Sequence, residues 1–320
     1  MASRSAVLVS ALLLVAAIGA ASADDYTADG PCGGQKAKHA IILPKETGCK
    51  MLECLMNVIV TRPDPAKAGV GACAKGPYPV VYLFNGFSSR AEWYSYLPNR
   101  LASYGYVVVQ YNLNAILTTD AQEMKYLKPL QVWLQGESAD ASSPLSGALD
   151  FSQQATAGHS RGGKLAALHM AAEPKVFTTA VLIDPVDNTI FSPEGPAYPN
   201  AAKALAALDP KKTAAVIGAS VTSLCNPADA NFETFYAPLG PGSWREVQAG
   251  ATHTSYVALL EGVVPLPPVC GKGDMPAADV QKFTMATTVA WFEQAFRGAS
   301  TADFEAWIKA QKGITFGVKA

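Results

Sequence analysis

Residues 154–164, which read QATAGHSRGGK, decide how the chain folds. A short strand-like stretch runs into the segment 158–162, GHSRG, and helical sequence follows from 164 to 173. This is Gly-x-Ser-x-Gly at a strand-to-helix turn, where a serine hydroxyl stands exposed above a sheet. Glycines flank the serine because a Cβ at those positions would collide with the neighbouring strand or helix. The pattern predicts that Ser160 is a nucleophile.

Apolar strands alternate with helices on both sides of this turn. Two antiparallel strands are predicted first, at 40–43 and 56–61. The strands after them are expected at 78–84, 106–111, 154–158, 179–183, 213–220 and 244–249. Helices are predicted at 92–104, 122–135, 164–173, 277–296 and 301–309. Such alternation indicates a mostly parallel sheet with helices on both faces. Together with the serine turn it predicts an α/β-hydrolase fold in one domain, residues 24–320.

Composition excludes several classes of function. The chain has 320 residues, of which 49% are hydrophobic and 16% charged, so it can bury a large core. Its formal charge is −1 and no long run of Lys or Arg appears, so a nucleic-acid partner is not expected. CxxC is missing and the four histidines are scattered, so no metal site is predicted. Acyl transfer by a serine needs no organic cofactor, and none is expected.

The first 23 residues have the pattern of a cleaved leader. Arg4 precedes an apolar stretch from Ala6 to Ala20, and small residues follow up to Ala23. A basic start, an apolar middle and a small-residue exit are typical of a signal peptide. The alternatives are a short membrane anchor, for which the stretch is near the lower length limit, and a hydrophobic organelle-targeting segment.

An even number of cysteines indicates disulfides formed in an oxidising compartment. We expect Cys225 to pair with Cys270, because both lie in loops around the predicted site, and the other four to pair among themselves: Cys32, Cys49, Cys54 and Cys73. The alternative is six buried thiols in a reducing organelle.

A serine hydroxyl needs an imidazole to take its proton, and the chain has few histidines to offer. His39 precedes the sheet, His159 lies inside the serine turn, and His169 lies in the following helix. His253 follows the last predicted parallel strand, downstream of Ser160 as the chain order Ser, acid, His requires. We predict that His253 is the general base.

The acid must lie between Ser160 and His253, at the carboxyl end of a strand. Three aspartates qualify by position: Asp184, Asp187 and Asp229. Asp184 is favoured because it directly follows a buried strand, where a carboxylate without a partner would be costly. Alternatively, Asp184 or Asp187 caps a turn.

An oxyanion hole in this fold combines two backbone N–H groups. The first belongs to Arg161, and the second comes from the loop 84–88, where Gly86 permits an unusual turn and Phe87 is the expected donor. The alternative is an ordinary Asn-Gly turn. Gly86 and Trp93 are also predicted to bind substrate. The alternative for Trp93 and its aromatic neighbours is that they belong to the hydrophobic core.

Several of these segments resemble the chlorophyllases of plants and green algae. The likeness rests on 158–164, GHSRGGK, and on 183–187, IDPVD, with support from 83–87, LFNGF, and 225–232, CNPADANF. The resemblance implies cleavage of the ester that joins phytol to the chlorophyll macrocycle, a chloroplast location, and Asp184 as the acid. A substrate of this kind also predicts peripheral contact with a membrane.

Two positions depart from the family pattern. His253 is followed by Thr-Ser-Tyr where the family often has Met-Asp, and Asn85 replaces a histidine. Both lie close enough to the site to affect substrate preference. Two other functions therefore stay open, namely a secreted lipase or cutinase-like carboxylesterase and a non-catalytic pigment or lipid binder.

Overall fold

A single sheet runs through the computed structural model, which describes residues 26–71, 73–114, 118–258 and 268–320. The predicted leader, residues 1–23, lies outside the described residues. The nine strands are β1 (Gln35–Ile42), β2 (Leu55–Arg62), β3 (Tyr78–Phe84), β4 (Val107–Leu113), β5 (Leu149–His159), β6 (Phe177–Ile183), β7 (Thr213–Ala219), β8 (Trp244–Gln248) and β9 (Ile314–Val318). Their spatial order is β1-β2-β4-β3-β5-β6-β7-β8-β9.

The six central strands, β4 to β8 in spatial order, are all parallel. Antiparallel pairs stand only at the two ends of this sheet, where β1 and β2 lead into β4 and β9 follows β8. Central strands are apolar on both faces because helices cover both; every residue of β3 is buried. These features confirm the predicted α/β-hydrolase architecture.

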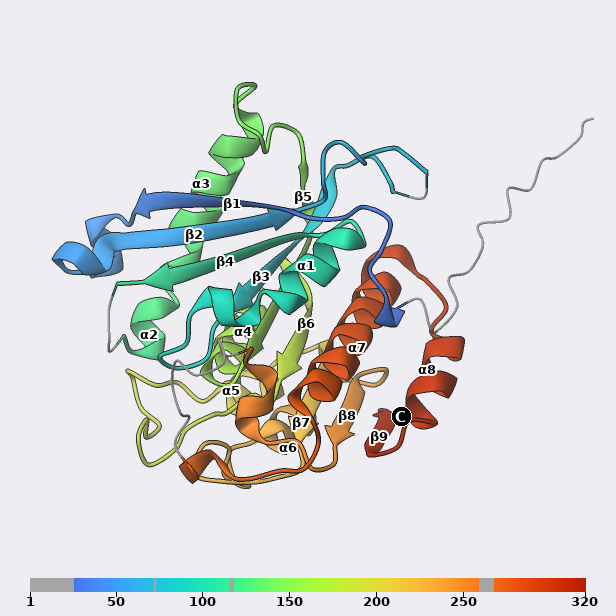
Figure 1. The fold of residues 1–320 in the computed structure, drawn as a ribbon. Coiled ribbons are helices and arrows are strands. Elements are labelled where there is room, and N and C mark those ends of the chain that lie inside the picture. Colours follow the sequence, from blue (N-terminus) through green and yellow to red (C-terminus); the bar gives the residue numbers. More distant parts are fainter. Residues whose placement is uncertain (1–25, 72, 115–117, 259–267) are drawn as a thin grey trace, which may run out of the picture.

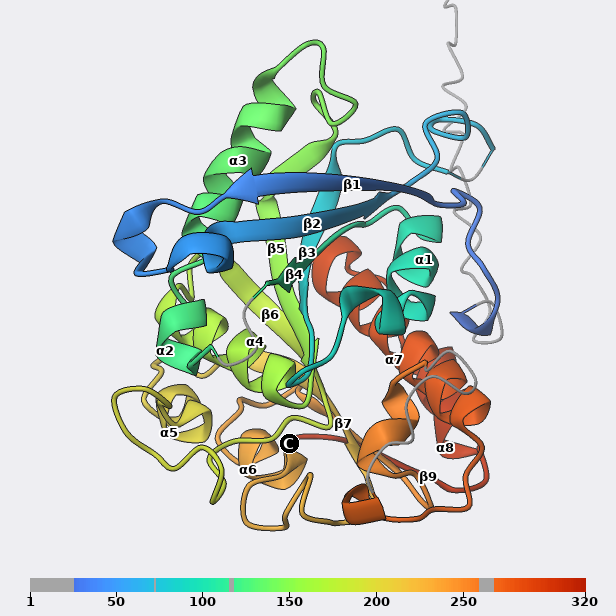
Figure 2. The ribbon, with the colours of Figure 1, turned by 60° about the vertical axis from the view of Figure 1, so that its left-hand side comes forward.

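Helices form a layer on each face of the sheet. They are α1 (Tyr96–Ser103), α2 (Asp120–Glu123), α3 (Leu127–Ala139), α4 (Arg161–Ala172), α5 (Ala201–Ala206), α6 (Phe232–Tyr236), α7 (Ala277–Arg297) and α8 (Ala302–Lys309). Figures 1 and 2 show α1, α7 and α8 on one side and α3, α4 and α5 on the other.

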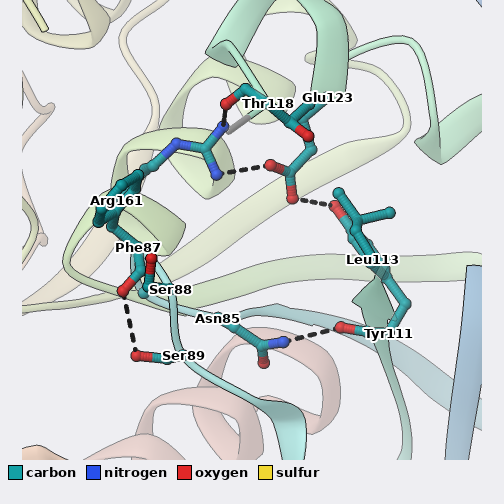
Figure 3. A pocket seen from close by; sticks show the side chains of 10 residues that line it. Asn85, Phe87, Ser88, Ser89, Tyr111, Leu113, Thr118, Glu123 and Arg161 are labelled. Atoms are coloured by element: carbon teal, nitrogen blue, oxygen red, sulfur yellow. Dashed lines mark hydrogen bonds and ion pairs between the residues drawn. The ribbon is translucent and has the colours of Figure 1, made fainter. Parts of the chain in front are cut away.

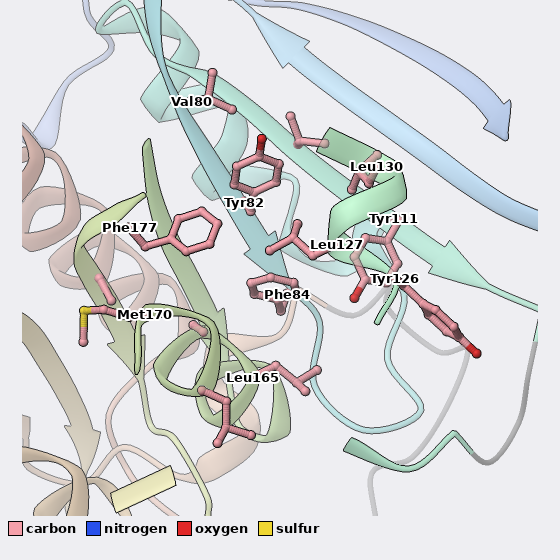
Figure 4. Packing of buried hydrophobic residues seen from close by; sticks show 14 of the residues in the cluster. Val80, Tyr82, Phe84, Tyr111, Tyr126, Leu127, Leu130, Leu165, Met170 and Phe177 are labelled. Carbon is pink, nitrogen blue, oxygen red and sulfur yellow. The ribbon is translucent and has the colours of Figure 1, made fainter. Parts of the chain in front are cut away.

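Two hydrophobic clusters fill the space between the sheet and its helices. Along β3, Val80, Tyr82 and Phe84 join one cluster, whereas Val81 and Leu83 join the other. This split follows from the alternation of side chains along a strand. Figure 4 shows the first cluster, in which the side chains of β3 pack against those of α3 and α4.

Two of the predicted helices are divided in the structure. The expected helix 92–104 begins as a 3-10 turn, Ala91–Tyr94, and becomes α1 only at Tyr96. The expected helix 122–135 is divided into α2 and α3.

Strand β9 was not predicted. In its pattern ITFGV only Phe316 is buried, so the sequence carries little of the apolar signal of a strand. It forms because the backbone of β8 offers a free edge with which it pairs.

The cysteines form three disulfides, Cys32–Cys73, Cys49–Cys54 and Cys225–Cys270. The first four pair among themselves, as predicted, and the free-thiol alternative is wrong. Within the described ranges, no helix combines the length and the apolar character needed to cross a bilayer.

Candidate active site

Ser160 stands at a sharp turn between β5 and α4. Its φ and ψ are 59° and −128°, a region that non-glycine residues rarely adopt. The turn is tight because strand and helix touch through their backbones: a Cβ on Gly158 would lie 2.2 Å from the carbonyl oxygen of Gly162, and one on Gly162 would lie 2.2 Å from that of Phe84. The Ser160 N–H donates to the carbonyl of Ile183 at 3.0 Å, which fixes the turn against β6.

His253 joins the serine to an aspartate. Its Nε2 lies 2.8 Å from Oγ of Ser160, and its Nδ1 lies 2.6 Å from Oδ2 of Asp184. Asp184 directly follows β6 and His253 begins a 3-10 turn, His253–Tyr256, after β8. The three side chains meet because the carboxyl ends of these parallel strands lie at one edge of the sheet.

Asp184 is fully buried, and its φ of 38° is one that non-glycine residues rarely adopt. Its charge is compensated by further donors, because Ala219 N–H donates to Oδ1 at 3.0 Å and the Asn226 amide donates to Oδ2 at 3.1 Å. Ser223 in turn donates to Oδ1 of Asn226 at 2.7 Å. The sequence does not predict that Asn226 donates to Asp184, although the segment 225–232 carries part of the family resemblance. No spacing rule connects an amide in this loop with Asp184.

The two other aspartates lie elsewhere. Asp187 is buried, 3.2 Å from Nζ of Lys164, and its carboxylate accepts the N–H groups of Ala201 and Ala202. Asp229 is exposed. Of the three candidates, the structure brings Asp184 to His253.

The remaining histidines do not reach Ser160. His39 lies in β1 beside Trp133, with 5.0 Å between the ring centroids. His169 stacks on Phe84, and burial lowers its pKa to about 3. His159 is buried next to the ring of His253, and burial, together with the charge His253 would carry, holds its pKa well below 6.5. The sequence places His159 inside the serine turn but does not predict its contact with the ring of His253.

A small pocket is lined by Arg161, the residue after Ser160, and by the loop 85–89 (Figure 3). Its wall includes Gly86, Phe87 and Arg161, three residues predicted to form the oxyanion loop or hole. Trp93 is not part of this wall; it is half-buried against the second core cluster, and its carbonyl accepts the Ala258 N–H at 2.8 Å. Its predicted contact with substrate stays a prediction.

The side chain of Arg161 is held by a buried polar network. Its guanidinium lies 2.7 Å from Asp120 and 2.5 Å from Glu123, and it donates to the carbonyl of Thr118 at 3.0 Å. Tyr111 donates to the other oxygen of Glu123 at 2.8 Å, as Figure 3 shows. The guanidinium charge of Arg161 is therefore already paired within the protein.

The described ranges contain no cluster of three or more His, Cys, Asp or Glu side chains suited to a metal ion. The arrangement that is present, a hydroxyl, an imidazole and a carboxylate in series, suits proton transfer from a serine and nucleophilic attack on a carbonyl.

The chain is similar in sequence to a protein family and to individual proteins of a plant. The family profile described as Chlorophyllase matches residues 56–315. Chlorophyllase-1 of Arabidopsis thaliana is 28% identical over 256 residues, which cover 70% of this chain and 74% of that protein. Chlorophyllase-2 of Arabidopsis thaliana is 32% identical over 124 residues, which cover 36% of this chain and 38% of that protein. The profile match includes Ser160, Asp184 and His253.

Proposed function

Because the chain belongs to the chlorophyllase family, we propose that it is a serine carboxylic-ester hydrolase that cleaves the phytol ester of chlorophyll to chlorophyllide and phytol. One observation carries the proposal: a single imidazole, that of His253, is within hydrogen-bond distance of both Ser160 Oγ and the buried carboxylate of Asp184. This geometry supports an active serine because the base and the group that orients it are both in place.

The reaction proceeds in two halves. Nε2 of His253 takes the proton of Ser160 while Oγ attacks the ester carbonyl, and the tetrahedral intermediate collapses as phytol leaves with that proton. In the second half, His253 takes a proton from a water molecule while the water oxygen attacks the carbonyl of the acyl-enzyme. Ser160 Oγ then leaves the carbonyl and takes that proton back from His253, which releases the acid. Asp184 stabilises the imidazolium formed in each half.

The negative charge on the carbonyl oxygen falls between two backbone N–H groups. Arg161 is the first residue of α4, so its N–H has no partner within the helix, and the positive end of the helix dipole points to the same place. The second N–H is that of Phe87, in the loop that also lines the pocket.

The test is hydrolysis of chlorophyll a by the mature chain and by Ser160→Ala, with a short p-nitrophenyl ester as a reference substrate. Chlorophyllide from the first and not from the second is the expected result. Turnover of the short ester alone would identify a general carboxylesterase of the lipase or cutinase kind. If neither ester turns over and a fluorophosphonate fails to label Ser160, the chain is a non-catalytic binder.

The proposal extends to peripheral contact with a membrane, where a phytol ester is found. Large apolar side chains are exposed on loops at the carboxyl edge of the sheet, the edge at which Ser160 stands: Phe87, Ile190, Phe191, Leu224 and Val269. Exposed apolar residues gathered around a site are typical of surfaces that meet lipid or a partner.

We also propose a chloroplast location, with the secretory pathway as the alternative. The disulfides require that the cysteines meet an oxidising environment during folding. A fluorescent protein fused to the full chain distinguishes the two compartments, and secretion of the fusion would favour the general carboxylesterase.

A further inference from the structure

A chain of hydrogen bonds runs behind the site, from the pocket loop to the backbone of His253. Gly86 N–H donates to Oη of Tyr94 at 3.2 Å, and Oη of Tyr94 lies 2.9 Å from Nδ1 of His159. Nε2 of His159 lies 2.9 Å from the carbonyl oxygen of His253. Tyr94 and His159 are both buried, so water does not compete for these bonds.

The direction of each bond is determined. A carbonyl oxygen only accepts, so Nε2 of His159 carries a proton. Burial holds the pKa of His159 well below 6.5, so its ring is neutral and Nδ1 has a free lone pair. Tyr94 therefore donates to Nδ1, and its oxygen accepts from Gly86; burial raises the pKa of Tyr94 to about 12, so its proton stays in place.

We infer that Tyr94 and His159 are positioning residues, which hold the loop that carries the second oxyanion donor in register with the residue that carries the base. This inference rests on the proposed function. Gly86 directly precedes Phe87, so an anchor on the Gly86 N–H fixes the peptide next to the proposed donor. At the other end, the bond to the His253 carbonyl fixes the backbone from which the imidazole projects.

If the loop of Phe87 and the backbone of His253 are no longer held in position relative to each other, kcat should fall more than the affinity for substrate. Oxyanion donors act on charge that develops only in the transition state, so their displacement lowers kcat and leaves KM nearly unchanged. A shift of about 1 Å in a reacting group can cost on the order of 100-fold in rate. Removal of one distant anchor should permit a smaller shift, so we expect kcat to fall by about 10-fold.

Tyr94→Phe is the test variant because it deletes one hydroxyl and keeps the ring. Tyr256→Phe is its matched control. Tyr256 is also fully buried, and its ring centroid lies 5.5 Å from that of His159, yet its hydroxyl has no hydrogen-bond partner among the described residues. Both variants remove a buried hydroxyl from the same aromatic group, so only the lost bonds differ.

We would measure kcat and KM on a p-nitrophenyl ester, and inhibition by a boronic acid, which mimics the tetrahedral intermediate. For Tyr94→Phe we expect kcat and boronate affinity to fall together by about 10-fold, with KM within about twofold of wild type. Tyr256→Phe should match the wild type in all three. Equal losses in both variants, or a change confined to KM, would overturn the inference.

A second measurement does not depend on turnover. The proton on Nδ1 of His253, held against Asp184, should give a low-field NMR resonance, and Tyr94→Phe should shift or broaden it while Tyr256→Phe leaves it unchanged. An unaltered resonance in Tyr94→Phe would contradict the positioning role even if the wild type hydrolysed no ester. Lack of esterase activity in the wild type would overturn the proposed function separately.

His159→Gln supplies the conservative comparison. A glutamine amide can still donate to the His253 carbonyl, whereas His159→Leu cannot. We expect His159→Gln to retain more of kcat than His159→Leu does. If the two are equal in kcat while both remain folded, the bond to His253 has no positioning role.

Discussion

Nδ1 of His253 lies 2.6 Å from Oδ2 of Asp184, a carboxylate with no exposed surface. A buried charge of this kind is tolerated only when donors surround it, and Ala219 and Asn226 supply two more. The contact therefore depends on three loops at once, those that follow β6, β7 and β8.

Asp184→Asn should lower kcat by a factor on the order of 10⁴, because an amide cannot stabilise the imidazolium and favours the wrong tautomer of His253. The measurement is kcat on a p-nitrophenyl ester, with Asp229→Asn as control. Asp229 is exposed, so its variant should keep the wild-type rate. A drop for Asp229→Asn instead would assign the acid to that loop.

Asn226→Ala should lower kcat by about 10-fold and the free energy of unfolding by about 1–3 kcal/mol, because Asp184 loses a buried donor. Ser223→Ala leaves the amide in place and removes only the bond that orients it, so its effect should be smaller. Steady-state kinetics and urea unfolding report the two quantities. Equal rates in Asn226→Ala and wild type would remove Asn226 from the site.

Gly162→Ala should prevent the turn at Ser160 from forming, because its Cβ would lie 2.2 Å from the carbonyl oxygen of Phe84. We expect little soluble protein and no labelling by a fluorophosphonate. Gly195→Ala, which places a Cβ in open space, should express and label normally. Normal labelling of Gly162→Ala would show that strand and helix can move apart.

Protein stability should fall with acid because of His169. Its pKa is about 3 in the folded protein, against an ordinary 6.5, so below pH 6.5 the unfolded chain binds a proton that the folded chain does not. The free energy of unfolding should therefore decrease as pH falls from about 6.5 toward 3, by about 1.4 kcal/mol per unit from this group. His169→Phe keeps the stack on Phe84, and urea unfolding at pH 7.5 and 5.0 should show a shallower dependence; an unchanged slope would contradict the assignment.

Phe191→Asp should weaken binding to phospholipid vesicles and slow hydrolysis of vesicle-bound chlorophyll by about 10-fold, since it places a charge among the exposed apolar loops. Turnover of a soluble ester should stay unchanged. Val132→Asp changes another exposed apolar residue, which lies on α3 away from these loops, and should have no effect on either. Identical vesicle binding in all three proteins would rule out membrane contact through this edge.

Local patterns predicted much of this fold, and long-range contacts account for what was missed. The central strands and the turn at Ser160 carry strong apolar and glycine signals, so their positions followed from the sequence. β9 has one buried residue and forms only because β8 has a free edge. The same holds at the site, where chain order and strand ends indicated Ser160, Asp184 and His253, whereas the contacts of Asn226 and His159 depend on loops that meet only after folding.

The backbone contacts at the turn around Ser160 also restrict how this gene can vary. Any nucleotide change that replaces Gly158 or Gly162 introduces a Cβ, and each Cβ would meet a backbone oxygen that no side-chain rearrangement can remove. Selection should therefore purge every missense allele at these two codons, whatever amino acid it encodes. Codons for the exposed loop residues around the site, such as Ile190 and Leu224, carry no such restriction, so the apolar surface proposed to meet a membrane can diverge while the turn stays fixed.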